Sequence, residues 1–231
     1  MSGDNEFQRL ADVKQRIERA ARNVGRDPQS VRIVAVSKTK PVEAIMACYQ
    51  AGQRDFGENR VQEFVQKVDQ LPQDCRWHIV GRLQTNKVKY LDHRVTLIHS
   101  LDRLSLLQKL EEIGQKKGIV WPVLVQVNVA HDEAKAGLDP GEVADFLIEV
   151  SKAAHVKVQG LMTIGRLGAS EEETRGFFRE LRELRDRLQA MNIPGIELKE
   201  LSMGMSDDFE IAVEEGATIV RIGRQIFGER D

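Results

Sequence analysis

The sequence contains little cysteine and no long hydrophobic run. Cys48 and Cys75 are the only cysteines among 231 residues, and their spacing matches no metal-binding motif. Two isolated cysteines are typical of a reduced intracellular protein rather than of a disulfide-stabilised secreted one. No apolar stretch approaches the length of a membrane span, and the N-terminus has no signal-peptide block. We therefore expect a cytoplasmic protein that makes no contact with a membrane.

An excess of charge of one sign is also missing. The 34 lysines and arginines nearly balance the 36 aspartates and glutamates, so the formal net charge is -2 at pH 7. Nucleic-acid and membrane-surface binders usually carry a strong positive charge, and we expect neither class of partner. The sequence shows no Cys/His pair, serine-triad motif or cluster of metal ligands, so we predict no metal site.

Linkers rich in proline, glycine or serine, low-complexity tracts and internal repeats are absent, so we expect one domain, residues 1–231. A glycine-rich dinucleotide fingerprint is missing as well. Ser37-Lys38-Thr39 follows the first predicted strand, where that motif would stand. This absence argues against a Rossmann nucleotide site.

Strand-like and helix-like segments alternate regularly along the chain. Strands are predicted at residues 31–36, 53–57, 77–81, 96–101, 122–129, 157–164, 196–202 and 218–223. Helices are predicted at residues 42–51, 59–70, 85–92, 103–117, 140–153, 171–191 and 207–215, after a first helix at the N-terminus. This order and length predict a single (β/α)8 TIM barrel, which is an α/β fold. A doubly wound open sheet is the alternative, which periodicity does not exclude.

Two of the predicted helices carry clear start signals. Asp139 with Glu142, and Ser170 with Glu173, each form a capping box. The second of these helices also carries an apolar stripe that we expect to face the sheet. The stripe consists of Phe177, Leu181, Leu184, Leu188 and Met191.

Lys38 is the residue that most strongly suggests chemistry. Alternation along the first predicted strand places Val34, Val36 and Lys38 on one face, so the amine follows two apolar residues towards the same interior. An apolar environment lowers the pKa of a lysine, and a neutral amine can attack a carbonyl group. The alternative is an exposed lysine that opens a loop, and Lys38 alone favours that alternative.

Polar residues and glycines gather at the predicted C-terminal ends of the strands, where active sites of such barrels lie. The loops after the seventh and eighth strands often bind phosphate. Here Gly204 and Gly223 would let the backbone approach an anion, and Ser206 offers a hydroxyl. Ser206 is equally suited to cap the helix that follows. Arg221 would lie on the inner face near the mouth, where it needs an acceptor.

Two other polar residues have structural interpretations. Asn59 followed by Gln62 fits a capping box that would start the next helix. His78 lies within the third predicted strand, where a hydrogen-bonded structural histidine is more common than a catalytic one.

Several short motifs stand together in this chain. They are Ala35-Val36-Ser37-Lys38-Thr39-Lys40-Pro41, Phe56-Gly57-Glu58-Asn59, His78-Ile79-Val80-Gly81, Leu83-Gln84-Thr85-Asn86-Lys87, Gly160-Leu161-Met162, Leu201-Ser202-Met203-Gly204-Met205-Ser206-Asp207-Asp208 and Arg221-Ile222-Gly223. Together they resemble the pyridoxal phosphate homeostasis protein family, also called the YggS or PROSC family. The resemblance runs from about Phe7 to the C-terminus, and the motif around Gly204 is its most specific part.

The resemblance implies a barrel similar to the N-terminal domain of alanine racemase, of the fold type III PLP proteins. Pyridoxal 5′-phosphate (PLP) would be held reversibly as a Schiff base on Lys38, with Arg221 facing the pyridine nitrogen. The phosphate would be held by Ser206, Gly223 and the backbone of Arg224, where the family more often has a threonine or serine. The cofactor-binding residues that the resemblance implies are Lys38, Asn59, Met162, Ser202, Ser206, Arg221, Gly223 and Arg224.

The implied function is PLP binding in intracellular vitamin B6 homeostasis, and we assign no catalytic residue. An arginine partner leaves the ring nitrogen unprotonated, which weakens carbanion stabilisation. Racemases on this barrel add a second domain that supplies a tyrosine base, whereas Tyr49 and Tyr90 fall in predicted helices here. The alternatives are a minimal PLP-dependent amino-acid racemase and a Schiff-base aldolase acting on a phosphorylated sugar.

The expected partner is therefore PLP as a small molecule, with transient contact to PLP-dependent enzymes as a further expectation. A monomer is expected, because no additional interface module is visible. Lys87 and Lys135 are either solvated loop lysines or secondary amines that help to transfer the aldehyde.

Overall fold

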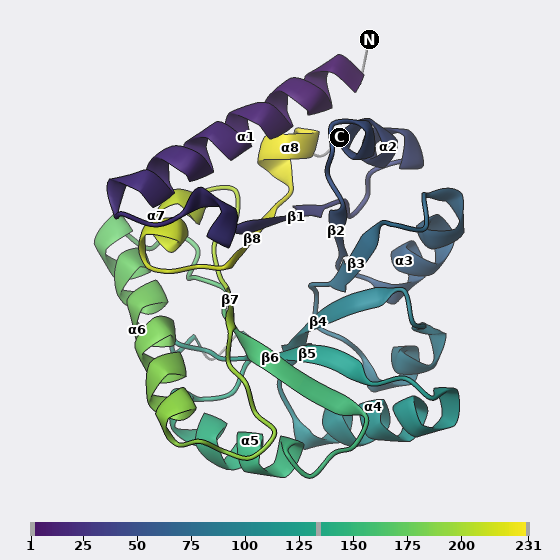
Figure 1. Cartoon of the computed structure of the whole chain (residues 1–231), viewed down its shortest axis with the longest axis vertical. Helices are drawn as coiled ribbons and strands as arrows, with labels where there is room; N and C mark the ends of the chain where they lie inside the picture. The colour runs from purple at the N-terminus through teal and green to yellow at the C-terminus, as the bar shows by residue number, and fades with distance from the viewer. Residues whose placement is uncertain (1–2, 133–134, 230–231) are drawn as a thin grey trace.

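The computed structural model describes residues 3–132 and 135–229, and its centre is a closed barrel of eight parallel strands (Figure 1). The strands are β1 (Arg32–Val36), β2 (Asp55–Glu58), β3 (Arg76–Ile79), β4 (Val95–Leu101), β5 (Trp121–Gln126), β6 (Val156–Met162), β7 (Glu200–Ser202) and β8 (Ile219–Ile222). Each strand pairs with the next one in the sequence, and β8 pairs with β1. The predicted barrel is confirmed, and the open sheet is wrong.

Helices surround the strands, and α1 packs against α2, α7 and α8 (Figure 1). The α-helices are α1 (Gly3–Asn23), α2 (Val42–Gln50), α3 (Val61–Lys67), α4 (Leu104–Lys117), α5 (Val143–Val150), α6 (Glu171–Ala190), α7 (Phe209–Glu214) and α8 (Arg224–Phe227). Short 3-10 helices are η1 (Pro28–Ser30), η2 (Val68–Gln70), η3 (Thr85–Tyr90) and η4 (Pro140–Glu142). None of the helices within the described ranges combines the length and apolar composition that crossing a membrane requires.

The strands divide the buried side chains into an inner and an outer layer. Along β1, Val34 and Val36 belong to the inner cluster, whereas Ile33 and Ala35 belong to the outer one. The alternation predicted for this strand is therefore confirmed. The buried members of the inner cluster are Val34, Val36, Val80, Leu97, Leu124, Met162 and Ile219.

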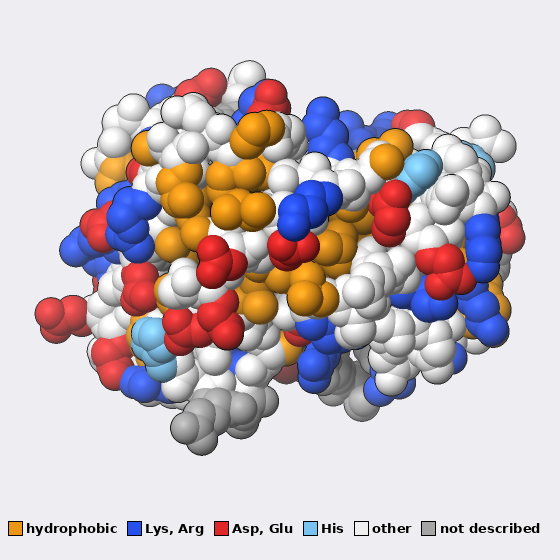
Figure 2. All heavy atoms as spheres, turned by 90° about the horizontal axis from the view of Figure 1, so that it is seen from below, with side chains coloured by type: hydrophobic (Ala, Val, Ile, Leu, Met, Phe, Trp, Pro, Cys, Tyr) orange, Lys and Arg blue, Asp and Glu red, His pale blue; other side chains and the backbone are white. Residues whose placement is uncertain are grey.

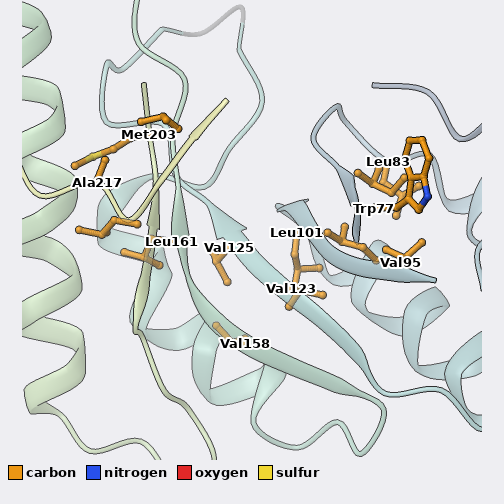
Figure 3. Close-up of a cluster of buried hydrophobic side chains, with 14 of the residues drawn as sticks. Trp77, Leu83, Val95, Leu101, Val123, Val125, Val158, Leu161, Met203 and Ala217 are labelled. Atoms are coloured by element: carbon orange, nitrogen blue, oxygen red, sulfur yellow. The ribbon is translucent and has the colours of Figure 1, made fainter. Parts of the chain in front are cut away.

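The outer layer, between strands and helices, is the larger of the two and fixes the frame of the barrel. Figure 3 shows part of it, with Trp77 and Val95 on one side and Leu161 on the other. The Trp77 ring lies 6.0 Å from the Phe56 ring and 5.9 Å from the Phe64 ring, between centroids. Burial of these large side chains ties α3 to β2 and β3 through the hydrophobic effect.

Both predicted capping boxes are formed. Ser170 Oγ accepts from the Glu173 N–H at 3.2 Å at the start of α6. At the start of η4, Asp139 Oδ1 accepts from the Gly141 N–H at 2.9 Å, and Glu142 accepts from the Asp139 N–H. The predicted stripe on α6 is correct in its centre and wrong at its ends. The helix buries Phe178 rather than Phe177, and Met191 is 51% exposed just after the helix ends.

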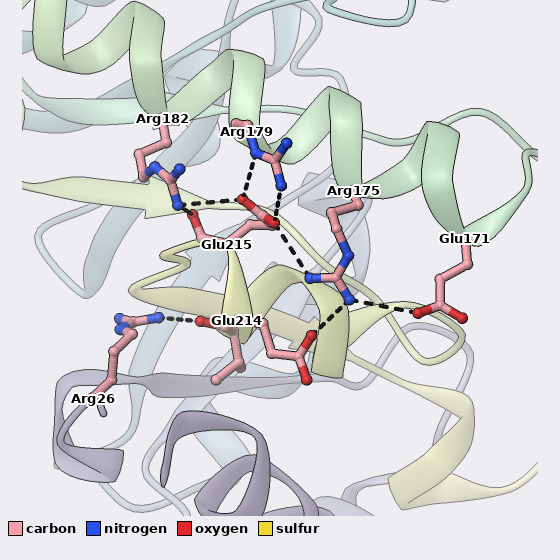
Figure 4. Close-up of polar contacts among 8 residues, drawn as sticks. Arg26, Glu171, Arg175, Arg179, Arg182, Glu214 and Glu215 are labelled. Carbon is pink, nitrogen blue, oxygen red and sulfur yellow. Dashed lines mark hydrogen bonds and ion pairs between the residues drawn. The ribbon is translucent and has the colours of Figure 1, made fainter. Parts of the chain in front are cut away.

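A cluster of ion pairs joins α6 to the turn after α7 (Figure 4). Glu215 is 5% exposed, and Arg175, Arg179 and Arg182 of α6 all lie within ion-pair distance of its carboxylate. Burial opposes ionisation, but the hydrogen bonds from Arg179 and Arg175 outweigh it, so the pKa of Glu215 lies below its usual value. The cluster therefore anchors α6 beside the segment that leads into β8.

Two predicted elements differ from the structure in more than their bounds, and the short helix α8 was not predicted. β7 spans three residues instead of the predicted 196–202, because Pro194 and Gly195 lie in a turn and the Leu198 N–H donates to Gln189 Oε1 at 2.8 Å rather than to a strand. The segment predicted as a helix at 85–92 is the 3-10 helix η3.

The surface around α5 is mixed in character. Figure 2 views the molecule from that side and shows apolar side chains gathered between acidic and basic ones. Ile148 of α5 is 42% exposed.

Candidate functional site

Arg221 on β8 is the centre of the polar groups at the C-terminal end of the barrel. Its side chain is buried, with the residue 4% exposed. Nη1 donates to Ser202 Oγ at 2.6 Å, and Nη2 donates to the Thr163 carbonyl at 2.8 Å. Burial lowers the pKa of Arg221 to about 10, with Asp208 acting in the opposite direction. The guanidinium is therefore charged at pH 7, and the predicted need for acceptors is confirmed.

Ser202 lies beneath Arg221, at the end of β7, and is fully buried. Its hydroxyl contacts His99 Nδ1 at 2.9 Å, and His99 in turn contacts His78, which contacts Asp55. The predicted structural interpretation of His78 is confirmed by these bonds. Sequence reasoning missed His99 and Asp55, although His99 follows Leu97 at the spacing of two that marks the inner face of β4.

The loop after β1 carries Lys38, which is half-buried. Ser37, the residue before Lys38, is held by Glu58 and by Lys67 of α3. Ser37 Oγ donates to Glu58 Oε1 at 2.7 Å, and Lys67 Nζ donates to the Ser37 carbonyl at 2.9 Å and to Glu58 Oε1 at 2.8 Å. These bonds fix the backbone immediately before Lys38.

Thr39, the residue after Lys38, is held by Glu63, which also lies on α3. The Thr39 N–H donates to Glu63 Oε2 at 2.6 Å, and Lys67 Nζ lies 3.3 Å from the same oxygen. Thr39 has a φ of 64°, a left-handed conformation that β-branched residues rarely adopt. The bond to Glu63 offsets part of the cost of that conformation, and Lys38 is thus presented from a loop fixed on both sides.

Glu58 is the least solvated acid in this group. It is fully buried, and burial raises its pKa even though the hydrogen bond from Lys67 acts in the opposite direction. Its Oε2 atom makes no hydrogen bond with any part of the chain that the structure describes. The ion pair with Lys67 is therefore what stabilises the ionised form of this buried carboxylate.

The loops after β7 and β8 meet at the side of the mouth where a phosphate was predicted. A Cβ at Gly223 would lie 3.2 Å from the Val36 carbonyl oxygen, so the backbone of β8 passes close to the end of β1. Ser206 Oγ accepts from the Gln225 N–H at 3.5 Å in the first turn of α8. The interpretation of Ser206 as a helix cap is wrong, because α7 begins at Phe209.

The side chain of Arg224 points to an acid rather than into the barrel. It is exposed, and it forms an ion pair and hydrogen bond with Asp207. At the start of α8 the N–H groups of Arg224 and Gln225 have no carbonyl partner within the helix. The backbone of this turn, and not the arginine side chain, is therefore the part suited to an anion.

Asn59 and Met162 lie on opposite sides of the mouth. Asn59 follows β2 and is half-buried, and a Cβ at Gly81 would lie 2.4 Å from its carbonyl oxygen, so the loops after β2 and β3 touch. The predicted capping role of Asn59 is wrong, because Arg60 occupies the cap position of α3 and makes no side-chain cap bond. Met162 ends β6 in register with Ser202 and is fully buried in the inner cluster.

A groove of about 1100 Å³ lies beside the mouth, between the loops after β2 and β3. Asn59 forms one wall, and Arg60, Arg82 and Lys87 supply positive charge. Lys135 lies elsewhere, with Nζ donating to the Gly165 carbonyl at 2.6 Å. Over the described ranges, no three His, Cys, Asp or Glu side chains are placed to hold a metal ion.

The sequence of this chain resembles those of known proteins over nearly its full length. Residues 9–231 match the family model "Alanine racemase, N-terminal domain". The chain is 47% identical over 227 residues to the pyridoxal phosphate homeostasis protein of Aquifex aeolicus, covering 98% of this chain and 99% of that protein. It is 40% identical to the protein of the same name from Pseudomonas aeruginosa, covering 96% and 94%.

Solved structures agree with these matches. PipY of Synechococcus elongatus, solved with PLP bound, has a TM-score of 0.85 and 39% identity, covering 96% of this chain and 100% of that one. An alanine racemase of Clostridium difficile shares the fold at a TM-score of 0.76 and 16% identity. The match covers 98% of this chain but only 57% of the longer racemase. Because the similarity extends over nearly the whole chain, the chain belongs to the pyridoxal phosphate homeostasis protein family.

Proposed function

We propose that this protein binds pyridoxal 5′-phosphate reversibly in the cytoplasm and acts in PLP homeostasis. The observation that carries the proposal is the buried, charged Arg221 at the same end of the barrel as the fixed Lys38 loop. The PLP-bound structure of PipY, a relative with 39% identity, supports the same ligand.

The residues at the mouth fit the three chemical parts of this cofactor. Lys38 supplies the amine for the aldehyde, Arg221 supplies N–H donors for the ring nitrogen, and the backbone around Gly223 and Arg224 with Ser206 suits the phosphate. When bound, PLP supplies a reversible aldehyde and an electron-withdrawing ring. Asn59 and Met162 would then lie beside the ring, and Ser202 would act through Arg221.

The same residues favour holding the cofactor over catalysis. Arg221 keeps its proton at pH 7 and can only donate, so a ring nitrogen facing it stays unprotonated and withdraws electrons weakly. Neither tyrosine is placed as an opposing base. Tyr49 Oη donates to Asp74, just ahead of β3, and Tyr90 ends η3, ahead of β4, so both lie towards the N-terminal ends of strands.

Equilibrium titration with PLP, followed by visible absorption, tests the proposal. Wild-type protein should form a saturable complex whose absorption band is lost in Lys38→Ala and retained in Lys87→Ala, the matched lysine control in the neighbouring groove. Adding a primary amine in excess should release the cofactor. A wild-type protein without a saturable band, or a band that survives Lys38→Ala, would contradict the proposal.

Delivery to PLP-dependent enzymes would follow from reversible binding. An enzyme lacking its cofactor should regain activity when mixed with the loaded protein, at a rate that depends on the concentration of both proteins if they touch. A rate equal to that of spontaneous release would show that no contact is needed.

A further inference from the structure

A continuous line of buried polar side chains crosses the barrel interior beneath Arg221. It runs from Ser202 on β7 through His99 on β4 and His78 on β3 to Asp55 at the start of β2. The Ser202 Oγ–His99 Nδ1, His99 Nε2–His78 Nδ1 and His78 Nε2–Asp55 Oδ1 distances are each 2.9 Å. Both imidazole rings are fully buried, so water does not compete for these contacts.

The acidic end of the line fixes the direction of its hydrogen bonds. Arg76 donates to both oxygens of Asp55, from Nε at 3.0 Å and from Nη2 at 2.5 Å, so the carboxylate is ionised and only accepts. His78 must therefore donate from Nε2. As a neutral ring it then accepts at Nδ1, which makes His99 donate from Nε2 and accept at Nδ1.

Burial keeps both rings neutral at pH 7. It lowers the pKa of His78 in spite of the hydrogen bond to Asp55. It lowers the pKa of His99 well below its usual value, and the positive charge of Arg221 acts in the same direction. A neutral imidazole donates once and accepts once, as the line requires.

The basic end of the line is compatible with the direction that Asp55 sets. An arginine can only donate, so the 2.6 Å bond from Arg221 Nη1 makes Ser202 Oγ an acceptor. The single hydroxyl proton of Ser202 is then free to point at His99 Nδ1. The two ends agree on one orientation for every bond between Arg221 and Asp55.

We propose that His99 and His78 are positioning residues that, through Ser202, aim the Arg221 guanidinium at the ring nitrogen of the cofactor. The inference rests on the proposed function, in which Arg221 meets that nitrogen. Ser202 Oγ and the Thr163 carbonyl hold Nη1 and Nη2, so two contacts fix the plane of the guanidinium. An apolar barrel interior would pack without this line, which is why a role beyond stability is indicated.

The first test uses the cofactor-free protein. Long-range ¹⁵N–¹H NMR spectra at pH 7 should show His78 and His99 as neutral rings with the proton on Nε2. Ser202→Ala removes the donor to His99 Nδ1, so the signal of that nitrogen should shift while both rings keep the proton on Nε2, because Asp55 still accepts from His78. Ser100→Ala is the matched control, because it removes a buried hydroxyl that donates to the Gly81 carbonyl at 2.8 Å outside the line. It should leave both rings unchanged.

A proton on Nδ1 of either ring in the wild type, a charged ring at pH 7, or unchanged spectra in Ser202→Ala would overturn the line. The wild-type spectrum decides this even if a variant fails to fold. His99→Phe, which removes the acceptor of the Ser202 hydroxyl, is a second variant for the binding experiment below.

The second test uses PLP labelled with ¹⁵N in the ring. Ser202→Ala and His99→Phe should each shift the ring-nitrogen signal and weaken PLP affinity about tenfold, the equivalent of one charge-assisted hydrogen bond, whereas Ser100→Ala should do neither. Unchanged signal and affinity in both line variants would overturn the positioning role while leaving PLP binding intact. A wild-type protein that binds no PLP would overturn the proposed function together with this role.

Discussion

Replacing Lys67 with methionine should destabilise the protein and loosen the loop that carries Lys38. The substitution keeps most of the side-chain volume and removes the cation that faces Glu58 at 2.8 Å. Glu58 is fully buried and the Lys67 side chain is 10% exposed, so the pair is a buried one. After the change, the Glu58 carboxylate keeps only the Ser37 hydroxyl as a side-chain donor.

The magnitude follows from the cost of leaving a buried charge without its partner, which is about 3–5 kcal/mol. The lower end applies here, because burial already raises the pKa of Glu58 and the acid can take up a proton instead. Urea unfolding at pH 7 should therefore show Lys67→Met less stable by about 3 kcal/mol. PLP affinity should fall as well, since the Ser37 carbonyl loses its donor.

Two controls separate this cause from a general loss of charge. Lys152→Met removes an exposed ion pair with Glu149, and its cost should stay below about 1 kcal/mol. The double variant Glu58→Gln/Lys67→Met removes the buried charge and should recover part of the loss. Equal stability losses in Lys67→Met and Lys152→Met would refute the reasoning.

Three further predictions address the frame, the phosphate side and the chemistry. Glu215→Gln should lower the free energy of unfolding by about 1–3 kcal/mol at pH 7. The difference should shrink as the pH falls below about 4.5, because the depressed pKa of Glu215 stabilises the fold only while the acid is ionised. A difference in urea unfolding that does not change with pH would contradict this prediction. Gly223→Val should weaken PLP binding, because the new side chain would meet the Val36 carbonyl oxygen. Wild-type protein should bind pyridoxal far more weakly than PLP, and equal titration curves for the two aldehydes would count against a phosphate site. In deuterated water, α-proton exchange of L-amino acids should stay close to that of PLP alone, because a missing base is worth about 10²–10⁴-fold in rate; fast exchange that disappears in Lys38→Ala would instead establish an enzyme.

The frame of the barrel was predictable because its signals are local. The alternation of Val34 and Val36, and the capping boxes at Ser170 and Asp139, depend on neighbouring residues and appear in the structure as expected. The strand predicted at 196–202 failed because the side chain of Gln189, on another element, takes the Leu198 N–H.

The site was predictable only in part. The inner position of Arg221 follows from strand alternation, but its partners are Ser202 at the end of β7 and Thr163 just after β6, and no local sequence pattern joins them to it. The local capping motif at Asn59 is not used, because α3 begins one residue later with Arg60 at the cap position. The line through His99 needs the register of four strands, which one sequence does not reveal.

The most direct test of reversible cofactor binding at the barrel mouth is to locate the covalent link. Purified protein is saturated with PLP, reduced with borohydride and digested, and the modified peptide is identified by mass spectrometry. We expect the modification on Lys38, and none in a parallel sample in which excess amine released the cofactor before reduction. Modification mainly on Lys87 or Lys135, or modification that the amine does not remove, would contradict it.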